Sequence, residues 1–236
     1  MIKTTLRALR DLFFPRNCLV CGRPLGAAED SLCIPCAAGL PFTHLWKLPH
    51  NPLADRINAR IEAPGEHYAY AAALLIYKSG SPYNKIPQAL KYSYDRAAGR
   101  RFARLLGLQL REAAHFADVD LVVPVPLHWT RKFRRGYNQA EVIARAVAGA
   151  LGASCDPRAL RRRRRTKTQT RLSVEEKARN VASAFRAAPP RPDVRHILLI
   201  DDVLTTGATL TASFLALRSV YPLPVRISVA TLSAVL

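Results

Sequence analysis

A chain of 236 residues with 49% hydrophobic and 22% charged side chains has the composition of a soluble globular protein, with room for one large domain or one and a half. Its longest apolar stretch, residues 69–77, is far shorter than the ~20 residues that a membrane-spanning helix needs, so no membrane span is expected. The formal net charge of +19 suits a polyanionic partner such as nucleic acid, pyrophosphate or a phospholipid surface, without choosing among them.

The first 14 residues predict a basic amphipathic helix, with Leu6, Leu9 and Phe13 on one side. Charged residues interrupt the apolar core that a secretory signal peptide requires, so a cytoplasmic location is expected. We expect this helix to pack on its own domain, and attachment to a membrane surface is the alternative.

Two C-x-x-C pairs follow within one short segment, formed by Cys18 with Cys21 and by Cys33 with Cys36. Thiolates with this spacing can surround one zinc ion tetrahedrally, and a ligand set made only of cysteine is typical of a closed, structural zinc site. The segment is poor in large apolar residues, so it needs a metal or crosslinks to hold its shape. Two disulfides or a redox-active pair are the alternatives, and zinc suits a cytoplasmic protein better.

Prolines recur between residues 36 and 66 with little hydrophobic periodicity, which places a domain boundary near residue 65. Residues 1–65 would then form the N-terminal helix and the zinc module, and residues 66–236 the main domain. That domain is predicted to begin with a strand over 67–77, followed by a short helix ending near residue 92 and a longer helix over 96–113.

A second strand is predicted over residues 121–127, where prolines turn the chain out of the sheet. Arg131, Lys132, Arg134 and Arg135 follow, just before Gly136 and a predicted helix over 140–151. Cations that converge on the start of a helix favour an anion-binding site, and an exposed basic surface without a ligand is the alternative.

Residues 161–165 are five consecutive arginines, and a capping box that starts at Ser173 predicts a new helix after them. The run repels itself and is expected to be mobile when no anion is bound. Three roles are open to it, which are closing over an anionic ligand, binding nucleic-acid phosphates and keeping the protein soluble.

The most informative stretch is HILLIDDVLTTGATL, residues 196–210. Its apolar run 197–200 predicts a parallel strand covered on both faces, with Asp201 and Asp202 at the carboxyl end, where open α/β sheets bind ligands. Residues 205–209 lead into a helix from about Ala208 and predict a phosphate-binding turn, and a last strand is predicted over 225–232. The acids would repel a bare phosphate, so they are expected to meet hydroxyls or Mg²⁺. An acidic turn and a helix cap without a catalytic role is the alternative.

This stretch resembles the binding signature of the type I phosphoribosyltransferases, whose substrate is phosphoribosyl pyrophosphate (PRPP). Together with PVPL at 124–127, RRGYNQAE at 134–141, TQTRLSVEEKARNVASAF at 168–185 and the cysteine pairs, it makes the sequence similar to the ComF family over essentially its whole length. The resemblance implies an α/β, type I phosphoribosyltransferase fold, which is a mainly parallel sheet flanked by helices, with a small N-terminal zinc-binding module.

The resemblance also implies roles for single residues. Asp201 and Asp202 would hold the ribose hydroxyls, with Mg²⁺ bound alongside PRPP, and Arg135 and Lys167 would offset the charge of the departing pyrophosphate. The 5′-phosphate would be held by Thr205, Thr206, Gly207, Ala208 and Thr209. The pyrophosphate loop and its flanks would comprise Val125, Pro126, Leu127, Gly136, Asn138 and Gln139. The loop that closes over PRPP would act through Lys167, Gln169, Arg179 and Asn180.

By this resemblance the protein is a phosphoribosyltransferase that serves competence, DNA uptake or nucleotide salvage, with an acceptor that the sequence does not identify. The alternative is a non-catalytic accessory protein of natural transformation that binds single-stranded DNA and keeps the same fold, and the charge of +19 supports it. Proteins of the competence machinery and a second copy of the chain are open as partners; the sequence does not identify the oligomeric state, although dimers are common for this fold.

Overall fold

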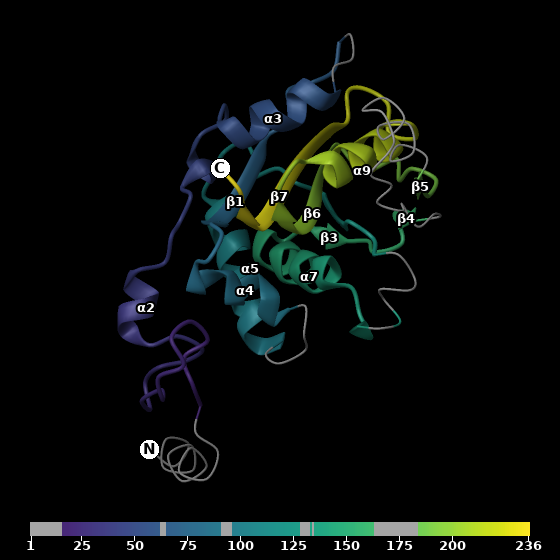
Figure 1. Ribbon diagram of the computed structural model, residues 1–236. Helices are drawn as coiled ribbons and strands as arrows, with labels where there is room; N and C mark the ends of the chain where they lie inside the picture. Colours follow the sequence, from purple (N-terminus) through teal and green to yellow (C-terminus); the bar gives the residue numbers. More distant parts are fainter. Residues whose placement is uncertain (1–15, 62–64, 91–95, 128–132, 134, 163–183) are drawn as a thin grey trace, which may run out of the picture.

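A five-stranded parallel sheet forms the centre of the computed structural model, which describes residues 16–61, 65–90, 96–127, 133, 135–162 and 184–236 (Figure 1). The strand order is β1-β7-β6-β2-β3, and every neighbouring pair is parallel. The strands are β1 (Ala71–Ile76), β2 (Leu121–Pro124), β3 (Ser154–Cys155), β6 (His196–Leu204) and β7 (Arg226–Ala234). This confirms the predicted fold class.

Helices cover both faces of the sheet. On one face lie α4 (Lys85–Ala89), α5 (Arg96–Arg111) and α7 (Gln139–Leu151), and on the other lie α3 (Pro52–Ile61) and α9 (Ala208–Arg218). Residues of β6 alternate between the two cores, because Leu198 and Ile200 pack with α5 and α7, whereas Ile197 and Leu199 pack with α3 and α9. A strand buried on both faces needs an apolar residue at every position, which explains the unbroken run in the sequence.

The observed strands differ in length from their predictions. β2 ends at Pro124 and not at residue 127, and β7 continues to Ala234, two residues past its predicted end. β6 continues past the apolar run through both acids to Leu204, because β7 pairs with it as far as Ala234. β1 begins only at Ala71, four residues after the predicted start at residue 67. The helix predicted from about Ala208 is confirmed and buries Leu210, Phe214 and Leu217, whereas Val220, which the apolar pattern predicts on the same face, lies beyond its end and is half-buried.

The first two residues of the arginine run belong to a second, small sheet. β4 (Leu160–Arg162) pairs antiparallel with β5 (Phe185–Ala187), and the Arg162 guanidinium lies 5.2 Å from the centre of the Phe185 ring. The expected mobility of the run was therefore wrong for Arg161 and Arg162, because cross-strand pairing holds them. Residues 163–165, the predicted N-terminal helix and the predicted helix after Ser173 lie outside the described residues.

The N-terminal part reaches the main domain through α2 (Ile34–Ala38), η1 (Leu45–Lys47) and α3. The boundary at residue 65 stays a prediction, but α3, which precedes it, places Leu53 and Ile57 in the core that β1 and α9 share. Within the described ranges, none of the helices is both long and apolar enough to cross a membrane.

Candidate functional site

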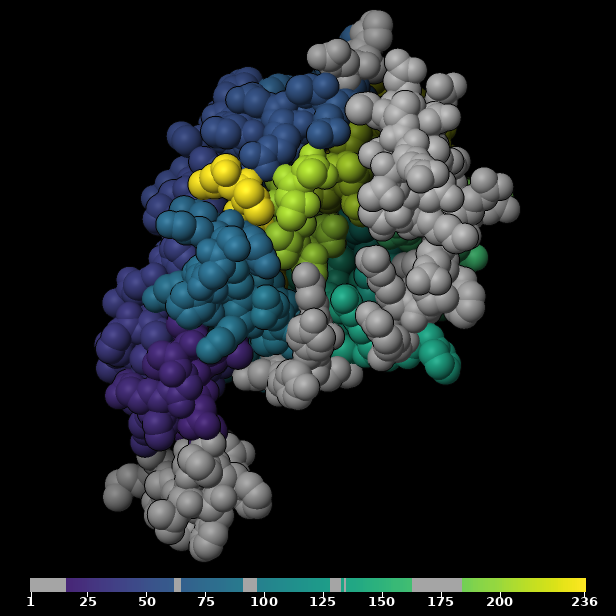
Figure 2. Space-filling model, viewed as in Figure 1, coloured from purple at the N-terminus to yellow at the C-terminus, as the bar shows by residue number. Residues whose placement is uncertain are grey.

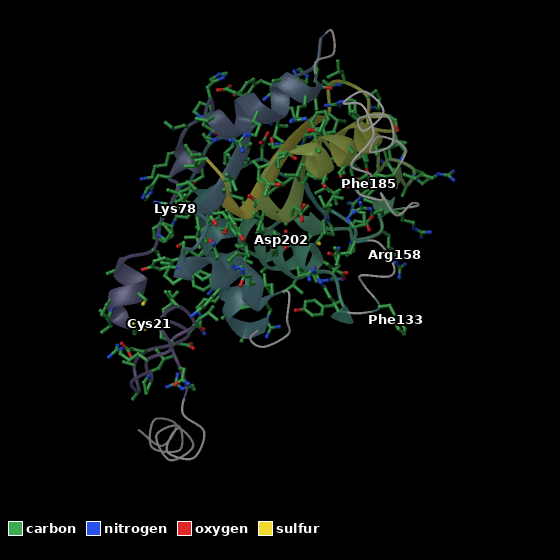
Figure 3. The ribbon with its side chains drawn as sticks, viewed as in Figure 1. Cys21, Lys78, Phe133, Arg158, Phe185 and Asp202 are labelled. Carbon is green, nitrogen blue, oxygen red and sulfur yellow. The ribbon has the colours of Figure 1, made fainter. Side chains whose placement is uncertain are left out.

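The two acids lie at the centre of the sheet, near the carboxyl end of β6, where Asp202 is marked in Figure 3. Both side chains are partly buried, and the Asp202 amide donates a hydrogen bond of 2.8 Å to Oδ1 of Asp201. Strands on both sides of β6 fix this position, since Asp201 is paired with Thr231 of β7 and Ile200 is paired with Pro124 of β2. The acids are thus presented from the central strand, which is paired on both sides.

The turn that follows, residues 205–209, joins β6 to α9 and is called the phosphate turn below. Gly207 precedes the helix with a φ of 83°, a backbone conformation that L side chains rarely adopt, and its carbonyl accepts the first helical hydrogen bond from the Thr211 amide at 2.8 Å. Thr205 and Thr206 are exposed. The first amides of a helix have no partner within it and sit at the positive end of its dipole, so this turn can bind an anion.

The carboxyl end of β2 is held beside the acids by its backbone. The Val125 amide donates to the Ile200 carbonyl at 2.8 Å, and Nδ2 of Asn138 donates to the Val125 carbonyl at 3.0 Å. The Val125 side chain is buried in the core, while Pro126 and Leu127 are half-buried. Both backbone polar groups of Val125 are thus already paired, and the predicted contact of this loop with pyrophosphate stays a prediction.

The residues after the loop divide into exposed and buried ones. Gly136 is exposed with a φ of 75°, and Arg135 is half-buried. Asn138 and Gln139 are buried, and Asn138 caps α7 by accepting from the Ala140 amide at 3.2 Å. Nε2 of Gln139 has no hydrogen-bond partner among the described residues. The side chain of Asn138 thus supports the loop from behind, and its predicted contact with PRPP stays a prediction.

Several predicted site residues cannot be placed. Those in the loop predicted to close over PRPP, and all but one of the cations after β2, lie outside the described residues. They are Lys167, Gln169, Arg179, Asn180, Arg131, Lys132 and Arg134.

The four N-terminal cysteines form one compact cluster. Their Sγ atoms all lie within 4.8 Å of one another, and the Sγ atoms of Cys21 and Cys33 are 3.7 Å apart. Zinc bound tetrahedrally at ~2.3 Å separates its sulfur ligands by about 3.8 Å, so the cluster has the dimensions of a zinc site. All four cysteines are free thiols, so the alternative of two disulfides is not what the structure shows.

The thiols also compete for ionisation. Burial raises the pKa of Cys36 to about 12, with the neighbouring thiols adding to the effect. Burial acts in the same direction on Cys18, but hydrogen bonds from the Cys21 and Cys33 amides outweigh it and lower the pKa of Cys18 to about 6. A divalent cation would favour the thiolate at every position, so the donor set fits zinc.

Polar contacts hold this cluster against the main domain on the side of α4 and α5, away from Asp202 (Figures 1 and 3). Nζ of Lys85 donates to the Val20 carbonyl at 2.9 Å, and the Tyr83 hydroxyl donates to the Cys36 carbonyl at 3.3 Å. Cys18 and Cys33 are themselves buried in the same core as α5. The module is therefore built into the fold through the loops that carry its cysteines.

Comparison with known proteins agrees with this architecture. Residues 124–234, from β2 to the end of β7, match the family described as phosphoribosyl transferase domain. The DNA utilization protein YhgH of Escherichia coli K12 is 31% identical over 214 residues, which is 84% of this chain and 89% of that protein. Competence protein F of Haemophilus influenzae is 27% identical over 211 residues, with the same coverage. The chain belongs to the ComF family.

The structure adds a residue to this ComF-family site that the sequence did not single out. Nη1 of Arg56, on α3, donates to the Thr205 carbonyl at 2.9 Å and to the Val235 carbonyl at 2.7 Å. Arg56 precedes the matched domain and lies 149 positions from Thr205. No local pattern signals such a contact, because only the tertiary structure brings α3 against the phosphate turn.

The small sheet is a second basic feature of this ComF-family chain. Arg161 of β4 and Arg186 of β5 are direct cross-strand partners, and both are exposed, as is the nearby Arg158. Like charges opposite each other destabilise a strand pair, so this arrangement favours a bound polyanion. Arg158 and Phe185 mark this side of the molecule in Figure 3.

Proposed function

We propose that this ComF-family protein binds PRPP together with Mg²⁺ and acts as a phosphoribosyltransferase. One observation carries the proposal. Asp201 and Asp202 lie near the carboxyl end of the central strand, a few residues before a left-handed glycine at the N-terminus of α9. This arrangement offers carboxylates for a diol and amides for a phosphate within one continuous segment, which suits a sugar phosphate.

The residues would divide the reaction as follows. The phosphate turn anchors the 5′-phosphate, and the two acids hold the ribose hydroxyls and stabilise the positive charge that develops on the ribose as its bond to pyrophosphate breaks. Residues 125–127 form the loop beside pyrophosphate, with Arg135 offsetting its charge. Bound Mg²⁺ would neutralise part of the same charge. A preorganised donor of this kind is typically worth about 3 kcal/mol of transition-state stabilisation.

The test is calorimetric titration of the full chain with PRPP, with and without Mg²⁺. The wild type should bind in a Mg²⁺-dependent manner, and the Asp201→Asn/Asp202→Asn variant should not. Asp193→Asn is the matched control. Asp193 is exposed, pairs with Arg191 at 2.9 Å and lies just before the amino-terminal end of β6, opposite the end that carries the two acids. Equal binding by the double variant and the control would refute the site.

The arginine pairing in the small sheet favours a second candidate function, which is binding of single-stranded DNA through phosphate contacts. Neutralising Arg161 and Arg186 should lower the affinity for an oligonucleotide. In a plot of the logarithm of the binding constant against the logarithm of the salt concentration, the slope should become shallower by about one for each lost phosphate contact. An unchanged slope, or no binding at low salt, would exclude this surface.

The names of two relatives, competence protein F and DNA utilization protein YhgH, support a role in competence and DNA uptake, and a role in nucleotide salvage belongs to the same proposal. Zinc in the cysteine cluster, a cytoplasmic location, partners from the competence machinery and a homodimer belong to the same proposal. The proposal does not name the acceptor of the phosphoribosyl group. Screening nucleobases for PRPP-dependent release of pyrophosphate would identify it.

A further inference from the structure

Helix α3 lies against the phosphate turn and the end of the last strand at the same time. Figure 2 shows this contact from outside, with α3 in blue beside the yellow C-terminal residues and the lime-green segment that contains the turn. The polar part of the contact is the Arg56 guanidinium, whose Nη1 bonds the carbonyls of Thr205 and Val235. Arg56 therefore ties the turn after β6 to the end of β7.

The bond to Thr205 also fixes the direction of the next amide. In a trans peptide the carbonyl and the following N–H point in opposite directions. Because the Thr205 carbonyl faces Arg56, the Thr206 amide is turned away from α3. A carbonyl directed at an anion would repel it. This orientation turns the Thr205 carbonyl away from the anion-binding side of the turn and leaves the Thr206 N–H facing that side.

Apolar packing holds the same turn from the same helix. Ile57 follows Arg56, and its Cδ1 would lie 3.1 Å from a Cβ added at Gly207, which is tighter than normal packing tolerates. Gly207 is buried, and Ile57 is completely buried in the core beneath α9. The helix and the turn therefore fit closely, and the backbone of the turn has little freedom to rotate towards another conformation.

We propose that Arg56 is a positioning residue of the phosphate-binding site, which holds the Thr205 carbonyl so that the Thr206 amide faces the 5′-phosphate of the sugar ligand. The inference rests on the proposed PRPP function and extends its site to a helix that precedes the matched domain. Arg56 does not contact the ligand in this assignment. Its effect on affinity passes through the backbone of residues 205 and 206.

Calorimetry with ribose 5-phosphate, PRPP and inorganic pyrophosphate tests this assignment. Arg56→Met keeps the length of the side chain but removes its donors, and it should weaken ribose 5-phosphate and PRPP binding by at least about ten-fold, while pyrophosphate binding is retained. Arg56→Lys keeps one donor group and should recover part of the loss. Thermal denaturation followed by circular dichroism would show that each variant is folded.

Arg60→Met is the matched control, because Arg60 lies one turn further along the same helix, with its Cδ 3.8 Å from the Cβ position of Gly207, but has no hydrogen bond to a described residue. It should bind ribose 5-phosphate within about two-fold of the wild type. An equal loss in both methionine variants would assign the effect to charge alone, and would overturn the positioning role. Full recovery of binding by Arg56→Lys would also overturn the positioning role. Loss of pyrophosphate binding by Arg56→Met would overturn it as well.

The outcomes separate this inference from the function on which it rests. If the wild type binds neither PRPP nor ribose 5-phosphate, the proposed function fails and the inference fails with it. If the wild type binds both and Arg56→Met binds them equally well, only the positioning role is wrong.

Discussion

The side chain of Asn138 joins the end of β2 to the start of α7, because its Nδ2 donates to the Val125 carbonyl at 3.0 Å while its Oδ1 accepts from the Ala140 amide at 3.2 Å. One buried residue thus positions the proposed pyrophosphate loop and caps a helix. The loop depends on this residue in the same way that the phosphate turn depends on Arg56.

Replacing Asn138 by alanine should cost about 1–3 kcal/mol of unfolding free energy and weaken pyrophosphate binding, since it removes both the cap and the bond to the loop. Asn138→Asp keeps an acceptor for the Ala140 amide but has no donor for Val125. It should retain more stability than the alanine variant and still lose pyrophosphate affinity. Urea denaturation and calorimetry would measure the two effects, and normal pyrophosphate affinity in the aspartate variant would contradict this assignment.

Substitution of Gly207 by alanine should disturb the phosphate turn specifically. A left-handed alanine costs about 1–2 kcal/mol, and the added Cβ would also press on Ile57. Gly80→Ala is the matched control, because Gly80 has a φ of 76° with no atom within 4 Å of the added Cβ. Both variants should lose stability in urea, but only Gly207→Ala should lose affinity for ribose 5-phosphate. Equal affinities would show that the turn does not hold the ligand.

Loss of metal should destabilise the N-terminal module, because Cys18 and Cys33 are part of the core and would lose the ion that holds their thiolates together. A Cys33→Ser variant should contain less than one zinc per chain by elemental analysis and should unfold at a lower temperature. Cys155→Ser is the control, since Cys155 lies in β3, outside the cluster. Full zinc content in Cys33→Ser would mean that the cluster is not the zinc site.

His196 should make the protein sensitive to acid. It is fully buried at the start of β6, with its ring nitrogens 2.8 Å from Asp118 and from Ser228. Burial lowers its pKa to about 4, and the weaker opposing effect of the Asp120 carboxylate does not offset this. His115, which lies near His196, and Arg226, which pairs with Asp118, are the other charged or titratable groups beside the His196 ring and Asp118.

In the unfolded chain the pKa of histidine is near 6.5, so below that pH the unfolded state takes up a proton that the folded state does not. The unfolding free energy should therefore be highest above about pH 6.5 and should fall by roughly 3 kcal/mol as the pH is lowered to about 4. Urea denaturation from pH 4 to pH 7 would measure this loss. His196→Gln removes the titrating group and should flatten the dependence in this window, and an unchanged slope would assign the effect to other residues.

Local sequence patterns were sufficient to predict the central strand, the glycine turn that follows it and the cysteine cluster. The run from Ile197 to Ile200 is apolar at every position because helices cover both faces, and this requirement is visible in the sequence itself. The cysteine pairs were equally readable, since each pair brings its own two thiols together and only the association of the pairs required the fold. The strand formed by Arg161 and Arg162 could not be predicted, because it depends on pairing with Phe185 and its neighbours.

The sequence by itself determined the chemical groups at the site, since carboxylates, a left-handed glycine and thiols act through local spacing that neighbouring residues set. Only the tertiary structure decided how these groups are held. Asn138 reaches Val125 across 13 positions, and Arg56 reaches Thr205 across 149. A hydrogen bond between such distant residues leaves no periodic signal in the chain. It depends on how the helices, such as α3 and α9, pack on the sheet that contains β2.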